Sequence, residues 1–349
     1  MQNQSFVPSS NFFPIESLPI ELIKIILTKV DWESLQKSRL VSKLFNNIIE
    51  QNFSQMQKPR VKHLIFRTLN IGPNWKKIAF FCGLEKNINI IQNITINTHN
   101  KPFNDKKIEY YFKRMNFSKL DYLKISSTGN IDAFNILNKY FKSKTKIRYL
   151  EIDIKMYPIL ESLTAFLKKI KHVKYFRIKN ICLGNEKIPH DYTLPKIKSM
   201  KALYIDECNC TKFINSRMIN KIFEQNKNLN YIEIYPNRKN IDTKLVKLIV
   251  ERQNSSYFEK CNHSNICLYL PIGDEYNRNT EFERLFYTTN YELKEPFEVF
   301  SITAQKSCEK CFSKKIIKVC FAKNFINFRF CPFLWIPKDI YLLYCIETI

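Results

Sequence analysis

Cysteine and histidine are the residue types whose spacing in this chain comes closest to a metal-binding pattern. Cys308 and Cys311 are separated by two residues, as in one half of a zinc site, and Cys320 and Cys331 follow. A structural zinc ion needs four ligands that converge on one point. Cys320 and Cys331 lie within or at the end of strand-like runs and are not a second closely spaced pair. We therefore expect free thiols and no metal site, with zinc at Cys308 and Cys311 as the alternative interpretation.

The sequence lacks the motifs of common catalytic sites. It contains neither G-x-S-x-G nor the phosphate-binding patterns G-x-G-x-x-G and G-x-x-x-x-G-K, and it has only five glycines. No histidine belongs to a recognisable nucleophile–base pair. We expect a protein that is not an enzyme and that has no cofactor. The five histidines are His63, His99, His172, His190 and His263.

Positive charge is the most conspicuous feature of the composition. Lys and Arg number 56 against 32 Asp and Glu, which gives a net charge of +24. Such a charge by itself favours nucleic acid or an acidic membrane as partner. The basic residues are spread along the chain rather than gathered in blocks, however, and Lys, Asn, Ile, Phe and Tyr are frequent throughout. We interpret the charge as a compositional bias and expect no nucleic acid partner; a basic nucleic-acid-binding repeat protein is the alternative.

The overall composition is typical of a folded chain from a reducing compartment. Hydrophobic residues make up 45% of the 349 residues, which excludes a mainly disordered chain. Eleven cysteines without a disulfide-framework spacing favour a reducing environment. No apolar run approaches the roughly 20 residues of a membrane span, and the N-terminus lacks the pattern of a secretory signal. We expect a cytoplasmic and/or nuclear location and no membrane partner.

The first sixty residues have the pattern of a small helical unit. Residues 1–15 are polar and are predicted to form a flexible tail. Pro19 and Glu21 favour a helix that begins near residue 19, and its apolar positions run most of the way round it. Such a helix needs packing partners on two sides. A second helix is predicted after Asp31, because apolar residues recur every three to five positions as far as Ile49.

This segment resembles the F-box over residues 16–52. The resemblance is carried by Leu18-Pro19-x-Glu21-Leu22 and by Arg39-Leu40-Val41-Ser42-Lys43, with Phe45 where the family commonly has tryptophan. It implies a substrate receptor that binds the Skp-type adaptor, and through it the cullin, of a cullin–RING ubiquitin ligase. The adaptor contacts that it implies are Leu18, Pro19, Leu22, Ile25, Ile26 and Val41. The residues alone leave open which of these face the adaptor and which face the interior of the F-box.

A second pattern, apolar-x-x-apolar-x-apolar, occurs seven times between residues 60 and 260. Because helical patterns lie between several copies, each unit is predicted to contain one strand and one helix. This resembles the long class of leucine-rich repeat, with degenerate copies. We therefore expect an α/β fold in which the helical F-box is followed by a leucine-rich-repeat-like solenoid over residues 60–260. The middle apolar residues, 26 to 30 positions apart, are Leu64, Ile94, Leu123, Leu150, Phe176, Leu203 and Ile232.

The repeat phase predicts which side chains form the concave face of this solenoid. Tyrosines recur there, and large amphipathic rings are favoured at protein-binding surfaces. We expect these rings to be at least partly exposed and to bind a protein substrate, although tyrosine is also simply frequent in strands. The charges of Lys124, Glu151 and Arg177 alternate on neighbouring strands about 4.8 Å apart, so they can pair with each other. The predicted substrate-binding residues are Tyr122, Tyr149, Tyr175, Tyr204, Tyr231 and Tyr235.

The repeat loosens after about residue 260. We expect residues 261–349 to form degenerate terminal repeats and a β-rich cap over the open end of the solenoid. Two strand-like stretches at 316–321 and 325–330 are predicted to pair as a hairpin, with Lys323 and Asn324 at the turn.

Overall fold

The computed structural model describes residues 14–72, 75–84, 92–99, 106–128, 132–155, 159–184, 186–208, 211–236, 243–254, 265–271, 284, 292–294, 301–308, 311–312 and 314–322. The chain divides into two compact units. The first contains Met1–Arg60 and Asp105–Asn116, and the second contains Val61–Asn104 and Phe117–Ile349. The first unit therefore includes a segment that follows the first three strands of the second.

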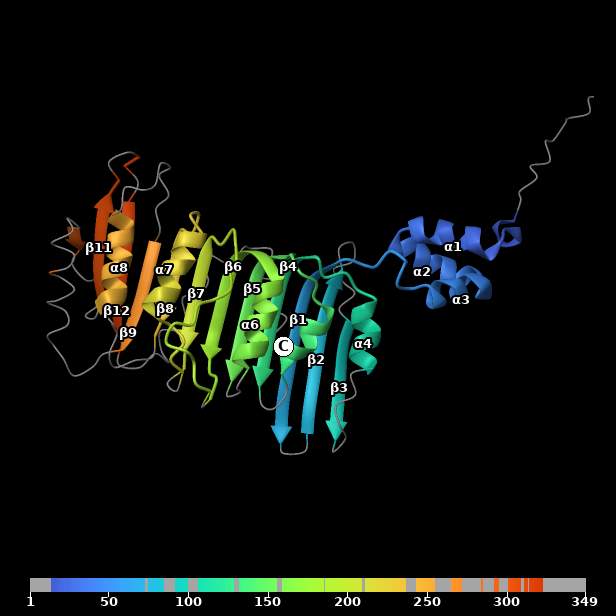
Figure 1. The fold of residues 1–349 in the computed structure, drawn as a ribbon, viewed down its shortest axis with the longest axis horizontal. Coiled ribbons are helices and arrows are strands. Elements are labelled where there is room, and N and C mark those ends of the chain that lie inside the picture. The colour runs from blue at the N-terminus through green and yellow to red at the C-terminus, as the bar shows by residue number, and fades with distance from the viewer. Residues whose placement is uncertain are drawn as a thin grey trace, which may run out of the picture. The chain divides into compact units, whose positions relative to one another are not determined.

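The first unit is helical (Figure 1). The sequence predicts one helix after Asp31, but the structure has two, because the Ser42 side chain accepts a hydrogen bond from the Leu44 amide and so begins a new helix. Asp31 caps the preceding helix by accepting from the Glu33 and Ser34 amides. The elements are a 3-10 turn η1 (Ile15–Ser17), α1 (Ile20–Lys29), α2 (Trp32–Val41), α3 (Lys43–Gln51) and α4 (Lys106–Lys113).

Helices α1, α2 and α3 share one hydrophobic core. The partly buried Leu18, Val30, Trp32 and Leu44 pack against its edge. This is a small core, as expected for a unit of this size. Its buried members are Ile23, Leu27, Leu35, Phe45, Ile48, Ile49, Phe53 and Met56.

The second unit is built on one 12-stranded mixed sheet in the order β10-β11-β12-β9-β8-β7-β6-β5-β4-β1-β2-β3. Its central strands are parallel, and both of its ends are antiparallel. The strands are β1 (Val61–Gly72), β2 (Trp75–Leu84), β3 (Gln92–His99), β4 (Lys119–Thr128), β5 (Thr145–Lys155), β6 (Ile170–Ile181), β7 (Ala202–Glu207), β8 (Tyr231–Tyr235), β9 (Asn265–Pro271), β10 (Glu292–Lys294), β11 (Ser301–Ser307) and β12 (Lys314–Ala322).

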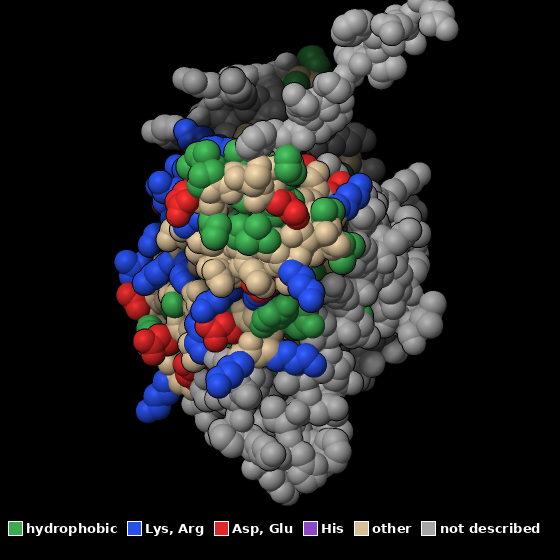
Figure 2. Space-filling view, turned by 90° about the vertical axis from the view of Figure 1, so that its right-hand side faces the viewer, with side chains coloured by type: hydrophobic (Ala, Val, Ile, Leu, Met, Phe, Trp, Pro, Cys, Tyr) green, Lys and Arg blue, Asp and Glu red, His purple; other side chains and the backbone are tan. Residues whose placement is uncertain are grey.

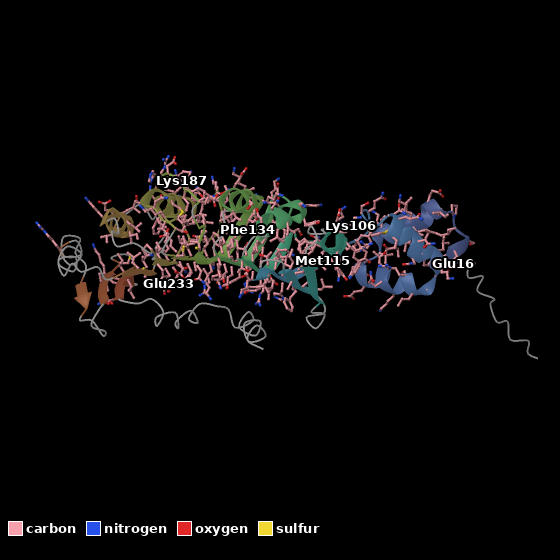
Figure 3. The ribbon with its side chains drawn as sticks, turned by 90° about the horizontal axis from the view of Figure 1, so that it is seen from below. Glu16, Lys106, Met115, Phe134, Lys187 and Glu233 are labelled. Atoms are coloured by element: carbon pink, nitrogen blue, oxygen red, sulfur yellow. The ribbon has the colours of Figure 1, made fainter. Side chains whose placement is uncertain are left out.

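Helices of the second unit lie together on one side of the sheet (Figures 1 and 3). Phe134 and Phe166, from two neighbouring helices, are fully buried with their ring centroids 5.6 Å apart. Figure 3 shows Lys187 on the helix side of the sheet and Glu233 on the other. These helices are α5 (Ala133–Tyr140), α6 (Leu160–Lys169), α7 (Ser216–Gln225) and α8 (Thr243–Asn254).

The predicted strands at the seven repeat positions are present, but one of them is arranged differently from a solenoid repeat. The copy around Ile94 lies in β3, which pairs antiparallel with β2, and β1 pairs directly and in parallel with β4. Strand β2 was not predicted, because Trp75–Leu84 lies between two copies of the apolar motif, outside their regular spacing. The leucine-rich-repeat interpretation of the remaining strand–helix units stays a prediction.

At the other end of the sheet, the predicted hairpin can be followed only in part. Strand β12 covers the first predicted stretch and pairs antiparallel with β11 and in parallel with β9. The second stretch, 325–330, lies outside the described residues.

Candidate functional site

The tyrosine row of the sheet is largely buried. The exposed fractions of Tyr122 and Tyr149 are 1% and 0%, and Tyr204 and Tyr235 are also buried, so the prediction that these rings are at least partly exposed is wrong for these four residues. Only Tyr175 and Tyr231 keep part of their surface accessible. Leu123 and Leu150, next to the row in sequence, are buried as well. At these positions β4 and β5 are therefore buried on both faces.

Contacts between neighbouring strands cover part of each tyrosine ring. The rings of Tyr122 and Tyr149 stack with their centroids 5.3 Å apart, and Tyr149 and Tyr175 are 6.5 Å apart. Tyr122, Tyr149 and Ile65 form a separate hydrophobic cluster, against which Tyr175 also packs. In-register parallel strands place equivalent side chains side by side, so a repeated tyrosine packs against its own copies. The role of the six tyrosines in substrate binding stays a prediction.

Charged side chains form a second row on the same face. Lys124, Glu151 and Arg177 are in register on β4, β5 and β6. The Glu151 carboxylate lies 3.4 Å from the Lys124 ammonium and 3.9 Å from the Arg177 guanidinium, so the predicted pairing of alternating charges is confirmed. Arg177 also lies over the ring of Tyr204, 4.6 Å from its centroid.

Glu233 occupies the same row on β8 and is buried. The Tyr231 hydroxyl donates to its carboxylate at 2.8 Å, and the Tyr235 hydroxyl donates to the other oxygen. Burial raises the pKa of Glu233 above its ordinary value, while the two tyrosine hydrogen bonds act in the opposite direction. Burial likewise raises the pKa of Asp153. In this row Glu151 is paired with Lys124 and Arg177, and Glu151, Arg177 and Glu233 are buried.

Among the residues that the structure describes, no group of three or more His, Cys, Asp and Glu side chains could hold a metal ion. Cys308 is buried and Cys311 is exposed, while Cys331 lies outside the described residues. In the same described part of the chain, no helix is long and apolar enough to cross a membrane.

The first unit exposes several large apolar side chains. Apart from Tyr110 on α4, they come from η1, α1 and the end of α2. Figure 2 shows hydrophobic side chains gathered on the face that is turned to the viewer. On α1 the buried Ile23 and Leu27 are four residues apart and face the core, which leaves the other apolar positions outside. The exposed large apolar residues of η1, α1 and α2 are Ile15, Ile20, Leu22, Ile25, Ile26, Leu40 and Val41.

This exposure answers part of the question that the sequence left open. Of the six residues implied as adaptor contacts, Leu18 packs against the core. Ile25 and Val41 are 57% and 74% exposed, among the most accessible large apolar side chains described. A surface of this kind is typical of a protein–protein contact. The remaining three, Pro19, Leu22 and Ile26, are also exposed.

Residues 15–53 match the F-box domain family. This supports an F-box protein, and the matched segment contains all seven exposed apolar side chains of η1, α1 and α2. F-box domains typically bind Skp-type adaptors, and such a domain in general suggests a substrate-adaptor role in a ubiquitin ligase. Neither the curated proteins nor the solved structures gave a match to the chain.

The F-box unit also contains an ion-pair cluster that the sequence analysis missed. Glu50 on α3 accepts from Arg39 on α2 and from Arg114, directly after α4, the latter at 2.6 Å. The Arg114 guanidinium lies over the rings of Phe53 and Tyr110, 4.6 and 3.7 Å from their centroids. Glu50 thus joins the F-box to a helix more than fifty residues away in sequence, a distance over which no local pattern could reveal the contact.

Proposed function

We propose that this chain is the substrate-recognition subunit of a Skp–cullin–F-box ubiquitin ligase. In this function the F-box binds the Skp-type adaptor and, through it, the cullin. The second compact unit, which we call the sheet unit, binds a protein substrate. The chain itself is not an enzyme and acts by tethering, which raises the effective concentration of the substrate near the catalytic subunits of the ligase. Its place of action is the cytoplasm and/or the nucleus.

The observation that carries the proposal is the match of residues 15–53 to the F-box together with the exposed apolar surface of the same segment. Burying apolar surface stabilises a complex by about 25 cal/mol per Å² before the costs of association are subtracted. Leu22, Ile25 and Ile26 on α1 and Val41 on α2 offer such area without leaving the core of the F-box. Leu18 contributes to that core and supports the surface from within.

A binding assay with a purified Skp-type adaptor tests the first half of the proposal. We expect the double variant Ile25→Lys, Val41→Lys to lose adaptor binding, because each new ammonium group would be buried without a partner at the interface, at a cost of several kcal/mol. Both side chains are exposed in the free protein, so the F-box should stay folded.

The matched control is Phe312→Lys. Phe312 is 81% exposed and lies in the sheet unit, so the same type of substitution should leave adaptor binding unchanged. Retention of full adaptor affinity by the double variant would refute the assignment of this surface.

A further inference from the structure

A hollow of about 420 Å³ lies where β4, β5 and β6 begin. Its lining combines a few buried apolar residues with a concentration of positive charge. The only acidic residue among the described lining residues is Asp121. The basic residues in the lining are Lys119, Lys146, Arg148, His172 and Lys174.

The register of the sheet accounts for this concentration. Lys119 pairs with Lys146, Lys146 with His172, and His172 with Lys198, so four basic residues stand at one level of neighbouring chain segments. Parallel strands lie about 4.8 Å apart, which sets the spacing of the row. Lys119, Lys146 and Lys198 are exposed, and His172 is half-buried. We call these four residues the basic edge.

Like charges at the basic edge repel one another. Burial lowers the pKa of His172, and the charges of Lys171, Lys146 and Lys198 lower it further. Its Nδ1 lies 3.0 Å from the Ser199 hydroxyl, and Ser199 has a left-handed backbone with φ of 67°. No ion pair described for this part of the chain is made by Lys119, Lys146 or Lys174. Like charges held this close together are stabilised when an anionic group binds between them.

We propose that the basic edge and its hollow bind an acidic, carboxylate-rich segment of the protein substrate. The proposal rests on the proposed function, which requires a substrate-binding surface in the sheet unit. Carboxylates can pair with the ammonium groups of Lys119, Lys146 and Lys174. The lining also includes the buried Leu120 and Ile147, against which the methylene groups of Glu side chains can pack.

The composition of the hollow favours a peptide over a single-stranded nucleic acid. Proteins that bind single strands stack the bases on aromatic side chains. None of the described residues that line the hollow is aromatic. The aromatic residues of the neighbouring row, Tyr122 and Tyr149, are buried and cannot serve as stacking platforms.

Fluorescence anisotropy with the full chain tests the proposal at about 0.15 M salt, where surface charges are screened beyond about 8 Å. The probe is a labelled peptide rich in Asp and Glu, and the neutral comparison carries Asn and Gln in their place. We expect the acidic peptide to bind and the neutral peptide not to bind. The variant Lys146→Glu, Lys174→Glu should bind it at least tenfold more weakly, because two attractive contacts become repulsive.

The matched control is Lys168→Glu, Lys187→Glu. It makes the same change in net charge at residues that are also exposed, one on α6 and one on the helix side of the sheet (Figure 3), and should leave the affinity unchanged. Equal weakening by both variants would show an effect of net charge alone and would overturn the proposal. So would failure of the acidic peptide to bind, or tighter binding of a single-stranded RNA of equal charge that is lost in the same variant. Adaptor binding, measured separately, distinguishes these failures from a failure of the proposed function.

Discussion

Tyr122 and Tyr149 show how much the environment of a single residue changes its expected role. Both rings are fully buried and stack on one another. We predict that Tyr149→Ala lowers the free energy of unfolding by about 3–5 kcal/mol, the cost of removing a large aromatic side chain from a core. Phe312→Ala, at an exposed aromatic residue, should change it by less than about 0.5 kcal/mol. Denaturant titration of the two variants measures the difference, and a Tyr149→Ala variant as stable as wild type would show that the ring is not internal.

Glu233 gives the sheet a dependence on pH. The pKa of Glu233 is raised in the folded protein, so at pH values above the ordinary carboxyl range the native state binds more protons than the unfolded state. The contribution of Glu233 to the free energy of unfolding therefore falls as the pH rises through this range. We predict that the stability of wild type relative to Glu233→Gln increases as the pH is lowered from about 7 to about 5. Urea unfolding at several pH values measures this difference. A difference that is constant, or that falls on acidification, would contradict the pKa direction.

At the scale of elements, the F-box is extended by a segment from far along the chain. Glu50 accepts from both Arg39 and Arg114, and all three side chains are partly buried. We predict that Glu50→Ala destabilises the F-box by about 1–3 kcal/mol, because two guanidinium groups lose a charged acceptor. The exposed Lys113–Glu109 pair provides the control, since Glu109→Ala should cost no more than about 0.5 kcal/mol. Thermal unfolding of both variants tests the comparison, and equal effects would mean that Glu50 does not join these helices.

The elements that the sequence predicted correctly are those with a strong periodic pattern. Five copies of the apolar motif correspond to β4 to β8, and the apolar spacing near residues 20–30 corresponds to α1. The end of α2 at Ser42 was not predicted, because the apolar spacing continues through this residue. The Ser42 hydroxyl caps a new helix by a local hydrogen bond, which the apolar spacing does not reveal. Strand β2 was not predicted because Trp75–Leu84 lies outside the regular spacing of the apolar motif.

At the scale of the whole molecule, the sequence predicted one face of the sheet to be a free surface, whereas the structure buries Tyr122 and Tyr149 on that face. Periodicity identifies which side chains share a face, as it did for Lys124, Glu151 and Arg177, but it does not reveal whether that face is covered. Exposed apolar residues on α1 were easier to predict, because a small unit cannot bury a helix that is apolar most of the way round. Their contact with an adaptor stays a prediction that rests on the resemblance to the F-box. The basic edge is not part of the apolar motif, although its residues recur with the same period at the starts of neighbouring strands.

The proposed binding of an adaptor by the F-box and of a substrate by the sheet unit can be tested by affinity purification. The full chain and the Ile25→Lys, Val41→Lys variant are purified, and bound proteins are identified by mass spectrometry. We predict that a Skp-type adaptor and a cullin co-purify with the wild-type chain and are absent from the variant. Proteins bound through the sheet unit should be recovered with both, since the substitutions lie in the F-box alone. Absence of the adaptor and cullin from the wild-type sample, or their undiminished presence with the variant, would contradict the account.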